Sequence, residues 1–166
     1  MAYKLVCLGS TFTVGDTLDP SLAYPAVLQA AFAEKNIAVR VVNAAIRGET
    51  VQGAQERIPW LLQQRFDGML LELGNLEQER GHAIDSTHQE LIQLIATIRE
   101  ARPDADLFFL DLTGGTGSTP LPNLQSLAPD FPVDLRQISA AAQQRVADYL
   151  FTRLADQVVR EPLSRQ

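Results

Sequence analysis

The sequence lacks the features that mark several specialised classes of protein. Its 166 residues include one cysteine, so no internal disulfide can form and nothing calls for an oxidising compartment. No segment approaches the roughly 20 consecutive apolar residues that a transmembrane helix needs. The first residues also lack a basic stretch followed by an apolar run and a cleavage site. We therefore expect a cytoplasmic protein without membrane insertion.

Basic residues are also scarce. The 14 Lys and Arg residues are outnumbered by 20 Asp and Glu, which gives a net charge of −6 and a pI near 4.8. This acidic balance, without a Lys/Arg cluster, argues against a nucleic-acid partner. No set of His, Cys, Asp and Glu has metal-ligand spacing, so we predict no metal and no cofactor. The expected partners are a small molecule, another protein or a second copy of the chain.

The sequence does contain a regular alternation of apolar runs and amphipathic stretches. Four short apolar runs are typical of strands buried on both faces of a parallel sheet: residues 5–8, 38–42, 69–73 and 107–110. Helical patterns separate them at 24–36, 50–64 and 86–103, and a last helix follows Ser139. This order predicts one α/β domain over residues 1–166, with residues 160–166 as a frayed tail. We expect a doubly wound, flavodoxin-like parallel sheet of four to five strands with helices on both faces.

Three local features refine this prediction. Pro59 is expected to kink or split the second helix. Ser86 and Gln89 have the spacing of a capping box at the start of the third helix. Residues 112–135 are rich in Gly, Pro, Ser and Thr and lack a helical period, which is typical of a functional or mobile loop. Within this loop, Gly114–Gly117 invites comparison with a phosphate loop but lacks the Gly-Lys-Ser/Thr ending, so it is interpreted as a connector.

Ligands of such a sheet bind beyond the carboxyl ends of its strands, and the segments at those ends resemble the SGNH (GDSL) hydrolases. The matching stretches are LGSTFTVG, AYPAVLQAAF, VRVVNAAIRGETVQGAQERIPWLL, LLELGNLE and VDLRQISAAAQQRVADYL. They follow the family's order along nearly the whole chain, and small bacterial thioesterases and lysophospholipases are the most similar members. The resemblance implies the SGNH-hydrolase fold and acyl-ester hydrolysis.

The catalytic groups that the resemblance implies are only partly present. The nucleophilic serine falls on Thr11, and the aspartate before it falls on Ser10. The family's final acid is present as Asp134, whereas Gln137 replaces the histidine. A hydroxyl is a poor nucleophile at neutral pH until a base takes its proton, and a glutamine amide is not basic. The β-methyl group of Thr11 also restricts χ1 and crowds the approach to an acyl carbon.

The oxyanion hole and the cleft wall that the resemblance implies are also only partly present. Gly48 matches the oxyanion-hole glycine, whereas Leu76 replaces the asparagine and Glu77 the aspartate that follows it. Loss of one oxyanion-hole donor costs roughly 10²–10³ in rate. The remaining candidates for ligand contact are Ser10, Asn75 and His82. Relative to the family, residues 112–135 replace a longer stretch that usually supplies a fifth strand, so that strand is expected to be missing.

A structural role stays open for each of these residues. Thr11 also suits a polar turn that caps the next segment, and Gly48 suits a turn that needs a positive φ. Asp134 is consistent with a loop carboxylate, and Gln137 with an amide at the pocket rim. Glu72 lies inside an apolar strand, where an ionised carboxylate must be paired, so it is interpreted as buried support.

These departures favour a catalytically impaired or inactive SGNH-fold protein that binds a small molecule, an acyl-type ligand or a protein in the former cleft. Losing the catalytic base alone costs on the order of 10⁶ in a template serine protease. The alternative is a weakly active acyl-ester hydrolase, in which Thr11 is the nucleophile and a base outside the family pattern, such as His82, takes its proton. A purely structural or assembly role is the third hypothesis.

Overall fold

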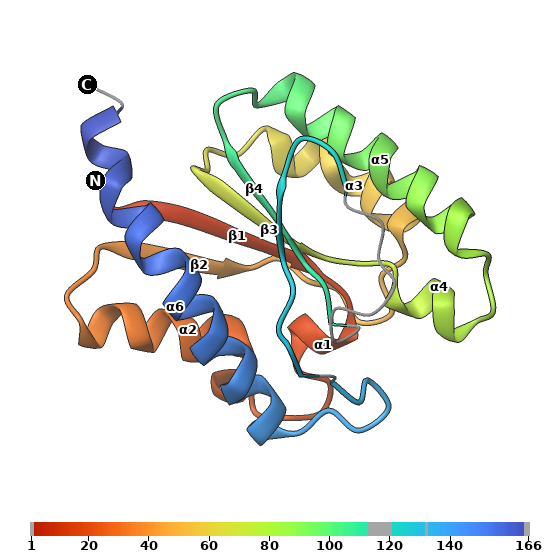
Figure 1. The fold of residues 1–166 in the computed structure, drawn as a ribbon, viewed down its shortest axis with the longest axis horizontal. Helices are drawn as coiled ribbons and strands as arrows, with labels where there is room; N and C mark the ends of the chain where they lie inside the picture. Colours follow the sequence, from red (N-terminus) through yellow and green to blue (C-terminus); the bar gives the residue numbers. More distant parts are fainter. Residues whose placement is uncertain (1, 113–120, 132, 165–166) are drawn as a thin grey trace.

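A parallel sheet forms the centre of the protein, shown here as a computed structural model that describes residues 2–112, 121–131 and 133–164 (Figure 1). Its strands are β1 (Tyr3–Gly9), β2 (Val39–Asn43), β3 (Gly68–Glu72), β4 (Asp106–Leu110) and β5 (Gln125–Leu127). They lie in the order β2-β1-β3-β4-β5, and every neighbouring pair is parallel. This order confirms the predicted flavodoxin-like, doubly wound fold.

Helices cover both faces of the sheet. They are α1 (Thr11–Val14), the 3₁₀ turn η1 (Pro20–Leu22), α2 (Tyr24–Glu34), α3 (Val51–Leu62), α4 (Asn75–Glu79), α5 (Ile84–Ala101) and α6 (Ala140–Ser164). Helices α2 and α6 pack together on one face, and α3 and α5 pack together on the other (Figure 1). The interpretation of Gly114–Gly117 as a connector lies outside the described residues.

Alternate residues of β1 supply two separate cores. Leu5 and Cys7 face the core shared with α2 and α6, whereas Val6 and Leu8 face the core shared with α3 and α5. This is why the strand reads as a continuous apolar run, as expected for a parallel strand covered on both faces. Burial raises the pKa of the Cys7 thiol to about 12, so this thiol packs as an apolar group and is not a nucleophile.

A fifth strand is present, so the prediction that it is missing is wrong. Strand β5 pairs with β4 in parallel, with Phe108 opposite Gln125 and Leu110 opposite Leu127. Only Leu127 of its three residues is buried, so this short edge strand has no apolar run to mark it in the sequence. Arg99 of α5 anchors the approach to β5 by donating to the carbonyl oxygen of Asn123 at 2.7 Å.

One expectation about a helix boundary, the start of the third helix at Ser86, is also wrong. Of the two outcomes predicted for Pro59, a kink or a split, the split does not occur. Helix α3 continues through this residue, which lies on the exposed side, where water can take the carbonyl that loses its N–H partner. Helix α5 begins at Ile84, two residues before Ser86, and its N-cap Ala83 makes no side-chain bond. A capping box at Ser86 is therefore not formed.

Two other helix starts follow from local chemistry. The hydroxyl of Thr50 accepts a hydrogen bond from the Gly53 N–H at 2.9 Å at the start of α3. The hydroxyl of Ser139 accepts one from the Ala142 N–H at 3.1 Å, which confirms that the last helix begins after Ser139. Among the described residues, no helix has both the length and the apolar character that crossing a membrane requires.

Candidate functional site

A small pocket lies at the carboxyl ends of β1 and β3, the edge at which sheets of this kind bind ligands. It encloses about 40 Å³ and is lined by Ser10, Thr11, Phe12, Glu72, Asn75, Leu76, Glu79, Leu135 and Ile138. The structure therefore brings together four of the predicted site residues: Ser10, Thr11, Asn75 and Leu76. We call this cavity the Thr11 pocket.

Thr11 is the first residue of α1 and is half-buried. Its Oγ1 accepts a hydrogen bond from the backbone N–H of Gly48 at 2.9 Å. Gly48 has a φ of 72°, a backbone conformation that favours glycine. The two residues thus meet as predicted, but the amide that would face an oxyanion points at the hydroxyl oxygen. The N-cap residue of α1 is Ser10, and its side chain makes no capping hydrogen bond.

Glu72 supports the backbone on which Thr11 stands. Its Oε1 accepts hydrogen bonds from the N–H of Ser10 at 3.2 Å, the N–H of Thr13 at 3.1 Å and the Thr13 hydroxyl at 2.8 Å. Its Oε2 accepts one from Asn75 Nδ2 at 3.3 Å. Burial raises the pKa of this carboxyl, and the four hydrogen bonds oppose that shift only in part. Glu72 is the buried support that its place in the strand indicated.

The segment that follows β5 presents apolar side chains to the Thr11 pocket. Leu135 and Ile138 line the pocket, whereas Asp134 and Gln137 are exposed and do not. Asp134 Oδ1 accepts a hydrogen bond from the backbone N–H of Arg136 at 3.0 Å, as a turn carboxylate does. The residues at the implied acid and base positions therefore do not line the Thr11 pocket, whereas the residue after each of them does.

His82, the predicted substitute base, is exposed in the turn between α4 and α5. Its backbone N–H donates to the carbonyl oxygen of Glu77 at 2.9 Å, and it is not among the residues that line the Thr11 pocket. Within residues 2–112, 121–131 and 133–164, no group of three or more His, Cys, Asp and Glu is arranged to hold a metal ion.

A wider, open groove of about 930 Å³ adjoins the Thr11 pocket. Its described lining consists of Glu79, Val133, Asp134, Leu135 and Arg136. Glu79 and Leu135 line both spaces.

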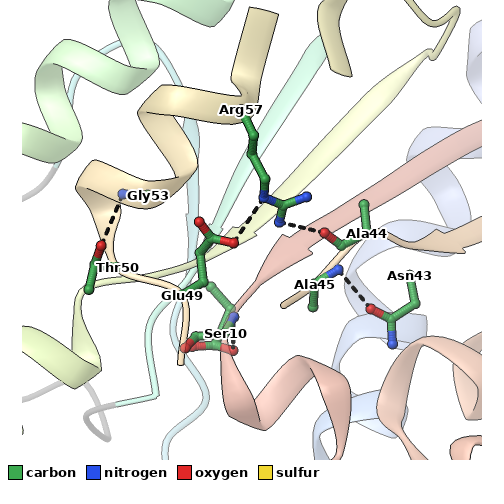
Figure 2. A network of polar contacts seen from close by, with 9 residues as sticks. Ser10, Asn43, Ala44, Ala45, Glu49, Thr50, Gly53 and Arg57 are labelled. Carbon is green, nitrogen blue, oxygen red and sulfur yellow. Dashed lines mark hydrogen bonds and ion pairs between the residues drawn. The ribbon is translucent and has the colours of Figure 1, made fainter. Parts of the chain in front are cut away.

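The sequence did not reveal two pairs of residues at the site. Glu49 is buried beside Gly48, and Arg57 of α3 donates from Nε to Glu49 Oε2 at 2.9 Å (Figure 2). Leu135 and Ile138 were also missed, although their spacing of three among polar neighbours matches one side of a helical turn. A charged pair eight residues apart has no local pattern, so only the fold reveals it.

Residues 7–165 match the family model of the GDSL-like lipase/acylhydrolase family, which is nearly the whole chain. The chain belongs to this family. The membership confirms the resemblance found in the sequence motifs.

The GDSL-family relatives include esterases and thioesterases. Thioesterase 1/protease 1/lysophospholipase L1 of Escherichia coli is 32% identical over 117 residues, which are 70% of this chain and 55% of that protein. Esterase TesA of Pseudomonas aeruginosa is 32% identical over 99 residues, or 59% of this chain and 49% of that protein. The chain spans about half the length of the curated relatives it matches.

Solved structures of GDSL-family and SGNH-hydrolase proteins share the fold. A crystal structure of TesA has a TM-score of 0.70 at 22% identity and covers 91% of this chain and 97% of its own. The esterase EstA from Pseudoalteromonas sp., inhibited by monoethylphosphonate, has a TM-score of 0.76 at 20% identity and covers 93% and 98%. At this level of identity, the likeness establishes the SGNH-hydrolase fold alone.

Proposed function

We propose that this GDSL-family protein binds a small amphiphile in its cleft and hydrolyses esters very slowly or not at all. The observation that carries the proposal is the lining of the Thr11 pocket. Leu135 and Ile138 lie there with Thr11, and no imidazole lines it among the residues that the structure describes. Neither apolar side chain can take a proton from the hydroxyl. Of the two carboxyl groups that also line the pocket, Glu72 is engaged by four hydrogen bonds and Glu79 is exposed.

The hydrogen bond between Thr11 and Gly48 supports the same conclusion. A hydroxyl becomes a nucleophile when a base draws its hydrogen away and leaves the oxygen lone pairs free. Here Oγ1 uses a lone pair to accept the Gly48 N–H, which lowers its nucleophilicity. The same amide is thereby engaged where catalysis would need it to meet a developing oxyanion.

The polar groups of the pocket suit a small uncharged head group, because the carboxyl groups of Glu72 and Glu79 also line it and disfavour an ionised acid. The Thr11 hydroxyl can donate its hydrogen, and the Ser10 hydroxyl and the Asn75 amide line the same pocket. About 40 Å³ of space accepts a carboxyl or hydroxymethyl group but not a large head. Leu135 continues the apolar wall into the wider groove, toward Val133. An uncharged acyl-type molecule, such as a fatty acid that holds its proton, has this combination of a small polar head and an apolar chain.

Hydrolysis and binding are tested on the same preparation. Turnover of p-nitrophenyl acetate and of a long-chain acyl thioester is expected to be equal, within about twofold, in the wild-type protein and in Thr11→Ala, because no base activates the hydroxyl. Dansylundecanoic acid is expected to bind the wild-type protein, with enhanced fluorescence. Ile138→Asp should abolish this binding, whereas Val159→Asp, a change at an exposed apolar residue of α6, should not.

Turnover that Thr11→Ala abolishes would contradict an inactive cleft. It would support the second candidate, a weakly active acyl-ester hydrolase. One observation favours that candidate: Glu72, whose pKa is raised by burial, lines the same pocket as Thr11. Glu72, and not the exposed His82, is then the base to test, and Glu72→Gln should abolish the turnover as completely as Thr11→Ala.

A further inference from the structure

The loop between β2 and α3 carries Gly48 to the cleft. Its backbone is tied to β1 by the Ala44 N–H, which donates to the Cys7 carbonyl at 2.9 Å, and by the Ile46 N–H, which donates to the Gly9 carbonyl at 3.2 Å. Beyond Ile46 these ties to β1 end. Nothing lies within 4 Å of the place where a β-carbon on Gly48 would stand, so no packed side chain fixes this glycine. The direction of its N–H must depend on its neighbours.

Arg57 connects the two ends of this loop. Its Nε donates to Glu49 Oε2 at 2.9 Å, and its second terminal nitrogen donates to the Ala44 carbonyl at 2.6 Å (Figure 2). The Glu49 side chain is 5% exposed and the Arg57 side chain 22%, so water competes little for either bond. Because the guanidinium is planar and rigid, it sets the separation between residues 44 and 49. Gly48 lies inside the span that is held in this way.

Gly53 of α3 provides the space in which the Glu49 carboxylate lies. A β-carbon at this position would stand 2.7 Å from Glu49 Oε1 and 3.3 Å from the Thr50 hydroxyl oxygen. Any side chain here would therefore displace the carboxylate from its present position. Glycine is otherwise a poor choice in a helix, since alanine favours the helical conformation more strongly. Its presence is explained by the need to accommodate Glu49.

We propose that Arg57, acting through Glu49, and Gly53, which makes room for the Glu49 carboxylate, are positioning residues that aim the Gly48 N–H at the Thr11 hydroxyl and the cleft. The inference rests on the proposed function only in taking the cleft to be the place where a ligand binds. The direction of the amide is a property of the free protein, so it can be measured without a ligand.

Amide hydrogen exchange of Gly48, followed by NMR on the full chain, tests this proposal. Arg57→Gln and Gly53→Ala should each accelerate exchange of the Gly48 amide about tenfold, because each frees the loop to open locally. Gln52→Ala, at the exposed residue before Gly53, is the matched control and should leave it unchanged. The amides of Val6 and Leu8 in β1 report global opening in each variant. Their exchange rates should match the free energy of global unfolding of that variant.

Gly53→Ala separates positioning from general stability. An ion pair that served only to stabilise α3 would gain from a better helix former, so the midpoint of unfolding would rise and the Gly48 amide would exchange no faster. Faster Gly48 exchange without a lower unfolding midpoint supports positioning. Gly48 exchange within twofold of wild type in Gly53→Ala would overturn it, even if Arg57→Gln failed to fold. Failure of the wild-type protein to bind dansylundecanoic acid would contradict the proposed function alone.

Discussion

The two sides of the Thr11 pocket differ in polarity. The side built by the ends of β1, β2 and β3 is a network of polar contacts, in which Glu72 accepts four hydrogen bonds and Gly48 donates to Thr11. The side built by residues 133–138 brings Leu135 and Ile138 to the pocket and leaves Asp134 exposed. Glu72 on the first side is bonded to buried backbone, so its loss would leave donors unsatisfied. Leu135 and Ile138 on the second side pack against the core and contribute no polar group to the pocket.

The largest expected effect comes from placing a base on the apolar side. In a Thr11→Ser/Leu76→Asn background, Ile138→His should hydrolyse p-nitrophenyl acetate at least about 10²-fold faster than Gln137→His, because general base catalysis contributes 10²–10⁴-fold when the base reaches the hydroxyl. Ile138 lines the pocket, whereas Gln137 is exposed. Steady-state rates of the two triple variants measure this difference. Equal rates would show that the two sides do not meet as described.

Removing the central carboxylate from the polar side should be the costliest change in stability. Glu72→Ala leaves the N–H groups of Ser10 and Thr13 and the Thr13 hydroxyl without their acceptor. We expect a loss of about 3 kcal/mol in the free energy of unfolding, measured by urea denaturation. Asp134→Ala, on the other side, is the control and should change it by less than about 0.5 kcal/mol. Similar losses of unfolding free energy in Glu72→Ala and Asp134→Ala would show that the two sides of the pocket contribute equally to stability.

The pH dependence of stability should also originate on the polar side. Burial raises the pKa of Glu72 in the folded protein above its ordinary value of 4.5, so the folded state holds this proton more tightly than the unfolded state does. Its contribution to stability is therefore present below pH 4.5 and is lost as pH rises through the raised folded value. Over that window the slope attributable to this group reaches at most about 1.4 kcal/mol per pH unit.

Glu72→Gln should remove this slope, and urea denaturation across pH measures it. The exposed Glu79, at the mouth of the same pocket, supplies the matched change Glu79→Gln, which should leave the slope in place. If the variant Glu72→Gln kept the slope of the wild-type protein, the slope would have to come from other carboxyl groups.

The smallest effect concerns the link between the turn after β1 and the loop after β2. Thr11→Val keeps the shape of the side chain but removes the acceptor of the Gly48 N–H. The expected loss of stability is about 0.5–1 kcal/mol, because water can reach this exposed amide in part. Thr11→Ser keeps the acceptor and should cost less than Thr11→Val. The order of these two variants in thermal denaturation checks that the bond, and not the packing of the side chain, is responsible.

Much of the fold was predictable because its signals are local. The apolar runs that became β1, β3 and β4 are mostly buried, and the apolar faces of α5 and α6 repeat at the helical period. The expectation of burial on both faces is wrong for β2, which lies at the edge of the sheet and buries only Val39, but its apolar run still marked it as a strand. Strand β5 was missed because its three residues, Gln-Ser-Leu, form no apolar run. The start of α5 was misplaced because the Ser86–Gln89 spacing matches a capping box, while the actual N-cap, Ala83, contributes no side-chain bond.

The site was predictable on one side only. Ser10, Thr11 and Asn75 follow the ends of β1 and β3. The carboxyl ends of parallel strands lie at the same edge of the sheet, so the topology alone brings these residues together. Residues 133–138 follow no strand, so the sequence could not tell whether Asp134 and Gln137 or Leu135 and Ile138 would meet Thr11. The pairing of Glu49 with Arg57 was likewise hidden, because an ion pair between a loop and the second turn of a helix depends on how the two segments are folded together.

The sequence by itself determined the alternation of strands and helices and the family. These properties depend on residue identity and on short-range periodicity. Only the tertiary structure decided that apolar side chains face Thr11, that the Gly48 amide bonds to its hydroxyl, and that Arg57 holds the loop in place. Such contacts join segments far apart in the chain, and their geometry is set by the packing of the whole domain.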